Sequence, residues 1–330
     1  MFQHTLPFDP TYGYDLDALM QVDRPDAGYE PADLETFWRA TYAEAAQVPP
    51  AITLHPIASP DPTKQLSEIE FDAWDLDGRT RRIGGWLIQP INEEPQLGLV
   101  MGHGYGGRET PLPLPDFGVP ATVIMPCMRG FYRSAHDDLP DNAAEHVVHG
   151  IEQRDTYLHR GCVTDVWAAA TALLSLTPNL AGRLRYWGGS FGGGIGAMAV
   201  PWDERFSRAF LDIPSFGHHP LRLQLQCTGS GEAVRHYHAQ HPAVIEVLRY
   251  YDAALCARYI SVPTLVAAAK FDPAVPPPGQ FAVYHALRCQ RELFVREYAH
   301  FELEEPLAEN DPWPVAARWI TSDLGDSHCP

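Results

Sequence analysis

The sequence has few basic residues and no long apolar run. Both features limit the classes of molecule with which the protein can interact. Its 330 residues include 24 lysines and arginines against 42 aspartates and glutamates, so the formal net charge is −18. Because this charge repels phosphates, we expect neither nucleic acid nor an anionic membrane as a partner. The longest apolar stretch, VWAAATALLSL (166–176), is too short to span a bilayer. The N-terminus lacks the basic and apolar regions of a signal peptide, which predicts residence in the cytoplasm.

The chain also lacks the cysteine and histidine spacings of common redox and metal sites. Its six cysteines contain no C-x-x-C pair, so we expect them to be reduced and mainly buried. Histidines gather in one segment, as His218, His219, His236, His238 and His241, without the H-E-x-x-H spacing of zinc enzymes. We therefore expect no metal and no cofactor, while these histidines leave a metal enzyme open as an alternative.

What the chain does have is a series of short apolar runs without clean alternation. The runs are LGLVMGHG (97–104), ATVIMP (121–126), RLRYWGGS (183–190), RAFLDIP (208–214) and PTLVAAAKFD (263–272). Such runs are typical of strands buried on both faces of a parallel sheet. Helical patterns at 162–177, 192–200 and 278–287 lie between them. The alternation predicts an α/β fold with a doubly wound, mostly parallel sheet.

The remaining segments read as additions to one domain that spans residues 1–330. Residues 1–65 form an N-terminal extension with an amphipathic helical pattern at 30–47. A β-hairpin is expected over 66–90, around the Asp77-Gly78 turn signal. The stretch 215–258 interrupts the strand–helix rhythm, and we expect it to be a helical cap insertion.

The stretch RYWGGSFGGGIGAMAV (185–200) places Ser190 among six glycines. No lysine follows these glycines as a P-loop requires, and a dinucleotide fingerprint is matched only approximately. The segment from Gly188 to Gly192 instead reads G-x-S-x-G, with a predicted strand before it and a small-residue helix after it. This is the pattern of a nucleophile elbow, a strained turn that exposes a serine hydroxyl.

A nucleophilic serine needs a histidine as base and an acid that orients the histidine. In α/β-hydrolases these residues follow the serine in the order acid, then histidine. Asp272 ends the predicted strand of 263–272, and His300 follows the β-prone run ELFVREYAHFELE (292–304). The order, the position at strand ends and the elbow together predict a Ser190–His300–Asp272 triad.

An oxyanion hole requires two backbone N–H groups beside the nucleophile. One is expected from Phe191, directly after the serine, and the other from the loop LVMGHGYGGRE (99–109), at Tyr105. His103 in that loop is expected to brace it by hydrogen bonding.

These segments together resemble carbohydrate esterase family 7, the acetyl xylan esterase and cephalosporin C deacetylase family of α/β-hydrolases. The similar stretches are PADLETFWRATYAEA, MGHGYGGR, MRGFYRS, GGSFGGG, YYDAALCARYISVPTL, FDPAVPP and YAHFE, which cover most of the chain. The resemblance implies the α/β-hydrolase fold, a triad of Ser190, Asp272 and His300, and oxyanion donors at Tyr105 and Phe191. It also implies an acetyl ester or acetylated oligosaccharide as substrate and a homo-oligomer, often a hexamer.

Three phenylalanines depart from the family motifs, at Phe131, Phe191 and Phe301. Phe191 replaces the glutamine that follows the nucleophile, beside a substrate pocket expected to include Tyr105. We expect the ring to fill this pocket and to keep the enzyme selective for acetyl. A ring buried in the core would instead leave room for propionyl or butyryl groups.

The function predicted from these residues is that of a serine esterase, which hydrolyses short-chain acetyl esters of sugars or related alcohols through an acyl-enzyme. A peptidase or thioesterase of the same fold stays open, because a triad alone does not select the leaving group. A non-catalytic binding protein is a further alternative, although a complete triad argues against it.

Overall fold

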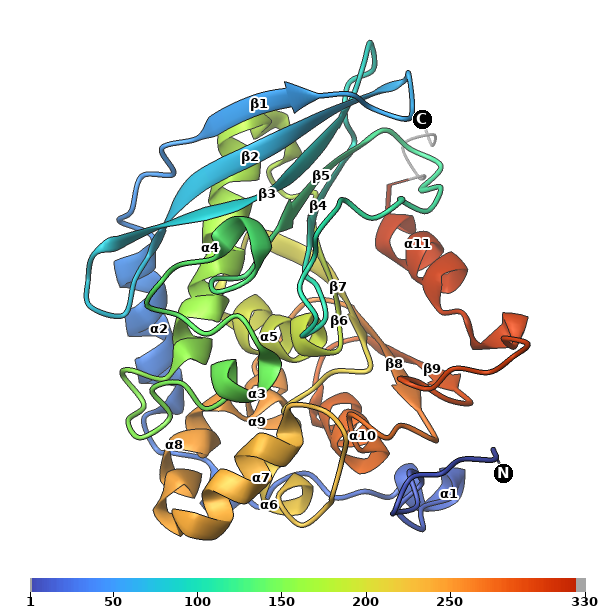
Figure 1. The fold of residues 1–330 in the computed structure, drawn as a ribbon. Coiled ribbons are helices and arrows are strands. Elements are labelled where there is room, and N and C mark those ends of the chain that lie inside the picture. The colour runs from blue at the N-terminus through green and yellow to red at the C-terminus, as the bar shows by residue number, and fades with distance from the viewer. Residues whose placement is uncertain (1, 325–330) are drawn as a thin grey trace.

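A nine-stranded sheet forms the centre of the computed structural model, which describes residues 2–324 (Figure 1). The strands are β1 (Thr53–Ile57), β2 (Lys64–Trp74), β3 (Thr80–Pro90), β4 (Leu97–Met101), β5 (Ala121–Pro126), β6 (Leu184–Gly189), β7 (Phe206–Asp212), β8 (Thr264–Ala269) and β9 (Arg291–Arg296). Their order across the sheet is β1-β2-β3-β5-β4-β6-β7-β8-β9. Pairing is antiparallel from β1 to β5 and parallel from β5 to β9. The predicted mostly parallel α/β sheet is therefore confirmed.

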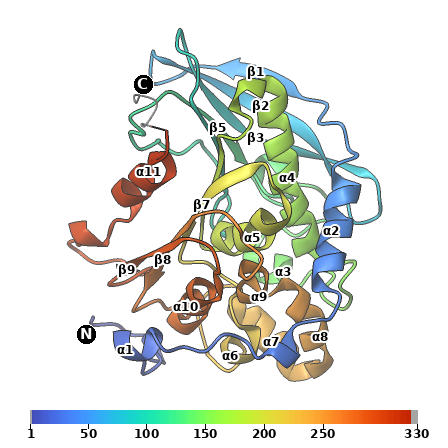
Figure 2. The same ribbon diagram turned by 180° about the vertical axis from the view of Figure 1, so that it is seen from behind.

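Helices cover both faces of this sheet, as the two opposite views show (Figures 1 and 2). They are α1 (Leu16–Leu19), α2 (Leu34–Ala45), α3 (Ala143–His146), α4 (Leu158–Leu176), α5 (Phe191–Ala199), α6 (His219–Arg222), α7 (Gly231–Gln240), α8 (Ile245–Leu248), α9 (Ala253–Ala257), α10 (Pro277–Ala286) and α11 (Trp313–Thr321). Helices α2, α4, α5, α9 and α10 lie on one face, while α11 covers the other face. Among the described helices, none is long and apolar enough to cross a membrane.

Successive side chains of the central strands enter two different hydrophobic cores. In β4, Val100 packs into the core under α4 and α5, whereas Leu99 and Met101 pack into the core under α11. In β5, Ile124 packs into the core under α4 and α5, and Val123 packs into the core under α11. Because both faces are buried, the strands need apolar residues at every position, which explains the absence of alternation in the sequence.

The predicted hairpin is present as β2 and β3. Gly78 forms the turn with a φ of +77°, and its N–H donates to the carbonyl of Asp75. β1 pairs with the outer edge of β2 and was not expected from the sequence. The C-terminal helix α11 was also missed, although Ala316, Ala317 and Ile320 repeat at helical spacing.

The segment between β7 and β8 contains the four short helices α6 to α9, beyond the carboxyl end of β7. In an open α/β sheet, ligands bind outside the carboxyl ends of the strands. The parallel strands β4, β6, β7 and β8 all end toward the same edge, and loops from each of them lie there. The functional site is therefore sought at this edge.

Glycine in α5 lets that helix approach β6 closely. A Cβ atom on Gly196 would lie 2.0 Å from Cε1 of the buried Tyr186 ring. Replacing glycine by alanine in an open helix interior usually stabilises it. We predict that Gly196→Ala instead lowers the free energy of unfolding by about 1–3 kcal/mol, because the core is overpacked there.

Urea unfolding of the two proteins measures this change. Gly28→Ala is the matched control, since a Cβ there meets nothing within 4 Å. A Gly196→Ala protein as stable as the unmodified chain would contradict the close contact between α5 and Tyr186.

Candidate active site

Ser190 lies in the sharp turn between β6 and α5. Its φ of 53° and ψ of −113° are unusual for a residue with a side chain. The Ser190 N–H donates to the carbonyl of Asp212 at 2.8 Å, and the Ser190 carbonyl accepts from the N–H groups of Gly194 and Ser215. These bonds hold the strained backbone in place and leave the hydroxyl at the carboxyl edge of the sheet.

The glycines around Ser190 are required by close approaches of backbone. A Cβ on Gly188 would lie 2.4 Å from the carbonyl oxygen of Gly192, and one on Gly192 would lie 2.8 Å from the carbonyl oxygen of His103. A Cβ on Gly193 would lie 2.9 Å from the carbonyl oxygen of Asp212. The strand, the turn and the helix can therefore pack this tightly only without side chains.

The three residues of the predicted triad lie within hydrogen-bonding distance of one another. His300 Nε2 is 3.0 Å from Ser190 Oγ. His300 Nδ1 is 3.0 and 2.9 Å from the two carboxylate oxygens of Asp272. A carboxylate can only accept, so Nδ1 carries the proton and Nε2 is free to accept from the serine hydroxyl. This is the geometry that a general base needs.

The Asp272 carboxylate is fully buried and fixed by three further donors. The N–H groups of Ala274 and Val275 donate to Oδ1 at 2.9 Å, and the Gln280 amide donates to Oδ2 at 2.9 Å. Gln280 was not predicted from the sequence, because its contact depends on how α10 packs behind β8. With these bonds the carboxylate can turn neither away from His300 nor toward solvent.

The electrostatic surroundings favour a protonated His300. Burial alone disfavours the imidazolium, but the Asp272 carboxylate and its hydrogen bond outweigh it and raise the pKa of His300. The more distant Asp212, which is paired with Arg296 at 2.9 Å, acts in the same direction. His300 is therefore a stronger base than an isolated histidine.

Two backbone N–H groups beside Ser190 have no acceptor among the described residues. They belong to Tyr105 and Phe191, the two positions expected to supply oxyanion donors. The neighbouring Gly192 N–H, by contrast, donates to the carbonyl of His103 at 2.9 Å. Unpaired donors at these two positions leave room for an oxygen of a bound molecule.

His103 braces this loop, as expected. Its Nε2 accepts from the N–H of Met128 at 2.8 Å, and its Nδ1 donates to the carbonyl of Gly104 at 2.7 Å. Burial lowers the pKa of His103 to about 3, which keeps the ring neutral and able to make both bonds.

The side chain of Tyr105 is held by two buried histidines that the sequence did not single out. Its hydroxyl lies 3.0 Å from His146 Nδ1 and 3.0 Å from His159 Nε2. His146 Nε2 donates to the carbonyl of Arg129, so its Nδ1 accepts from the tyrosine and the tyrosine accepts from His159. Burial lowers the pKa of His146 to about 4 and that of His159 well below its usual range. Both rings therefore stay neutral, which this chain of bonds requires.

The ring of Phe191 lies in the core, which corrects the expectation that it fills the substrate pocket. It is fully buried and stacks on the Tyr105 ring with 4.1 Å between centroids. It also contacts the rings of Phe131 and Phe216 edge-on. These aromatic contacts bury the ring, so Phe191 does not line the space around Ser190.

Two cavities flank Ser190, on either side of the elbow. The first, about 530 Å³, is lined by Tyr105, Ser190, Arg222 and His300, together with polar residues of the loops around them (Asp141, Asn142, Ser215, Thr228 and Ser230). The second, about 430 Å³, is lined by Met101, Trp187, Ser190, Asp212 and Trp313 among others. A bound molecule can therefore place one part in each cavity and still contact Ser190.

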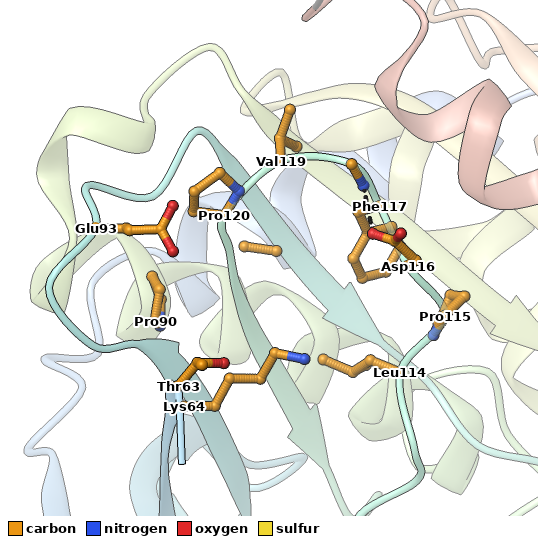
Figure 3. A pocket seen from close by; sticks show the side chains of 12 residues that line it. Thr63, Lys64, Pro90, Glu93, Leu114, Pro115, Asp116, Phe117, Val119 and Pro120 are labelled. Carbon is orange, nitrogen blue, oxygen red and sulfur yellow. Dashed lines mark hydrogen bonds between the residues drawn. The ribbon is translucent and has the colours of Figure 1, made fainter. Parts of the chain in front are cut away.

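A third cavity, about 320 Å³, lies away from these residues (Figure 3). It is formed by the start of β2, the end of β3 and the loop before β5, with Lys64, Glu93 and Asp116 at its border. None of the described residues that line it is a serine, cysteine or histidine, so its lining has no imidazole base paired with a hydroxyl or thiol as at Ser190. The candidate active site is therefore the one at Ser190.

Three of the five histidines that left a metal site open have polar partners of their own. His219 Nε2 bonds to the carbonyl of Tyr251 at 3.2 Å, His218 Nδ1 accepts from the N–H of Leu221, and His236 pairs with Glu232. Within residues 2–324, no three metal-ligating side chains come together.

Comparisons with known proteins identify the family and the fold of the chain. The sequence model of the family described as acetyl xylan esterase (AXE1) matches residues 15–312. The acetyl xylan esterase from Paenibacillus sp. R4 superposes with a TM-score of 0.77 at 22% identity, over 94% of this chain and 99% of that one. Acetyl xylan esterase 1 from Thermoanaerobacterium sp. JW/SL YS485 gives 0.78 at 20% identity, over 96% and 100%.

A puromycin-hydrolysing peptidase from Mycobacterium tuberculosis is also similar, but less so. Its TM-score is 0.52 at 16% identity, over 84% of this chain and 48% of that one. At such identities the superpositions show a shared fold, whereas the sequence match over nearly the whole chain shows the family. The chain belongs to the acetyl xylan esterase family and is a carboxylic ester hydrolase of the α/β-hydrolase fold.

Proposed function

We propose that Ser190 is the nucleophile of this esterase, with His300 as general base and acid and Asp272 as the orienting carboxylate. The observation that carries the proposal is the hydrogen-bonded chain from Ser190 Oγ through His300 to the buried Asp272. Ser190 attacks the ester carbonyl while His300 takes its proton. His300 then returns the proton to the leaving alcohol, and water hydrolyses the acyl-enzyme by the same steps in reverse.

The N–H groups of Tyr105 and Phe191 form the oxyanion hole in this proposal. Both lack an acceptor among the described residues and adjoin the serine, so they can donate to the oxygen that gains charge. The same two groups argue against a non-catalytic protein, because a binding module has no use for a free donor pair beside a serine–histidine bond.

The substrate class that fits best is a short acetyl ester of a sugar or a related alcohol. The larger cavity is lined by hydroxyl, amide and charged groups, which suits a polar alcohol better than a lipid chain. Thr228, Gly229 and Ser230, within the 215–258 segment, line this cavity, and we assign that segment the role of a cap. The homo-oligomer implied by the family resemblance, a hexamer in particular, stays a prediction, as does residence in the cytoplasm.

The first prediction concerns the nucleophile. Ser190→Ala should lower kcat for p-nitrophenyl acetate by about 10³-fold or more, because no other group can form the acyl-enzyme. Steady-state kinetics and circular dichroism measure activity and folding together. Ser175→Ala, on the exposed side of α4, is the matched control and should retain full activity. A folded Ser190→Ala enzyme with near-normal activity would remove the assignment.

The second prediction concerns pH. Since His300 must be neutral to act as base and its pKa is raised, kcat/KM should fall as the pH drops through a value above 6.5. Asp272→Asn removes the carboxylate that raises this pKa, so the acidic limb should move to lower pH. The maximal rate should fall by about 10³- to 10⁴-fold, because an amide does not stabilise the imidazolium. Asp17→Asn, an exposed carboxylate on α1, serves as control. A limb that stays in place in Asp272→Asn would show that another group titrates.

The third prediction concerns the acyl group. Because the Phe191 ring is in the core, it does not limit the acyl chain, and the cavities beside Ser190 have room for more than acetyl. We predict that p-nitrophenyl butyrate has a kcat/KM within about tenfold of that of the acetate. A loss of tenfold or more for each added carbon would mean that other residues close the acyl pocket.

A further inference from the structure

Arg222 is a buried cation at the wall of the larger cavity beside Ser190. Only 4% of its surface is exposed. None of its guanidinium nitrogens donates a hydrogen bond to a described residue, and Nε and Nη1 are sealed from solvent without an acceptor. Burying an arginine without a carboxylate partner is costly, since its charge and five N–H donors all lose water. The buried guanidinium of Arg222 at the edge of the active site therefore needs a hydrogen-bonding partner that the described residues do not supply.

The surroundings of Arg222 make room for it and add positive potential. A Cβ on Gly231 would lie 2.2 Å from Arg222 Nη2, so the guanidinium packs directly against the backbone of Gly231. The other side of the guanidinium faces the ring of Phe216 at 5.4 Å. Gly231 is also the first residue of α7, a ten-residue helix whose N-terminal end carries partial positive charge.

Arg222 and the first turn of α7 form one corner of this cavity, and further hydrogen-bond donors in this corner are unpaired. The N–H groups of Ser230 and Gly231 donate to no described residue, and the hydroxyls of Ser230 and Thr228 line the same cavity. The nearest carboxylate along the chain, Glu232, is already engaged by Arg235 and by the N–H of Cys227. Asp141 lines the same cavity but makes no hydrogen bond or ion pair with Arg222. The corner therefore offers a guanidinium and several donors that no carboxylate of the described residues engages, which is the complement of a bound carboxylate.

The position of His300 decides which part of the substrate meets this corner. In the proposed mechanism His300 delivers a proton to the leaving oxygen, so the alcohol lies on the side of His300. Arg222 and His300 line the same cavity. We propose that Arg222, with the first turn of α7, binds a carboxylate carried by the alcohol, so that the preferred substrates are acetyl esters of hydroxy acids or sugar acids. This inference rests on the proposed esterase function.

A pair of matched esters tests it. 3-(4-Acetoxyphenyl)propanoate and 3-(4-acetoxyphenyl)propanamide are nearly equal in shape, but the first ends in a carboxylate and the second in a neutral amide. The propanoyl chain insulates the leaving phenol from that difference. The unmodified enzyme should hydrolyse the acid with a kcat/KM about tenfold or more above that of the amide. Arg222→Met should bring the ratio of the two kcat/KM values to about one, chiefly by lowering the value for the acid, and Arg222→Lys should restore part of the ratio. Arg183→Met is the matched control, because it removes one positive charge in the same way. Arg183 is exposed and lies at the end of β6 opposite to Ser190, so this variant should leave the preference intact.

The unmodified enzyme alone can overturn the proposal, whether or not the Arg222 variants fold. Equal kcat/KM for acid and amide, or a preference for the amide, would contradict it. So would an equal loss for both esters in Arg222→Met, which is what a purely structural arginine predicts. Calorimetric binding of the two esters to Ser190→Ala separates this inference from the proposed function. Selective binding of the acid without hydrolysis by the unmodified enzyme would refute the nucleophile but keep the carboxylate site.

Discussion

The strained backbone of Ser190 is the constraint on which the rest of the site depends. A serine with φ of 53° is held between Asp212 on β7 and Ser215 beyond it, and α5 starts immediately after it. Gly192 and Gly193 in the first turn of α5 must be glycine, because backbone atoms of the His103 loop and of β7 come within 3 Å of where a Cβ would be. The same turn aims the Ser190 hydroxyl at His300 and leaves the Phe191 N–H without an acceptor. One turn thus carries the backbone strain, the proposed nucleophile and one of the proposed oxyanion donors.

Around this turn, neutral buried groups hold the loops while charged groups face the cavities. His103, His146 and His159 are kept neutral by burial and bond to the loop that carries Tyr105. The pKa of His300 is shifted in the opposite direction, because the Asp272 carboxylate raises it. The molecule therefore holds histidine in two ways, as neutral hydrogen-bonding rings in the core and as a ring with a raised pKa at the edge of the sheet, where we propose that it acts as a base. The difference is whether a carboxylate lies beside the ring.

The sequence predicts those parts of the site that follow local rules. The elbow is a five-residue pattern, and Asp272 and His300 follow predicted strands in the expected order, so spacing alone brings them to one edge of the sheet. The prediction that the Phe191 ring fills the substrate pocket was wrong. The direction of this ring depends on how Tyr105 and Phe216, from distant segments, pack against it. Arg222 could not have been found either. Its significance lies in the lack of a partner, which only the folded arrangement of α6 and α7 reveals.

The central claim is that Ser190 becomes covalently modified with the help of His300. A p-nitrophenyl alkylphosphonate tests it directly, because phosphonylation of an activated serine gives a stable adduct that mass spectrometry of the digested protein locates. The account predicts one adduct, on the peptide that contains Ser190, whose formation slows by orders of magnitude in His300→Ala. An adduct on another residue, or labelling of Ser190 at the same rate without His300, would contradict it.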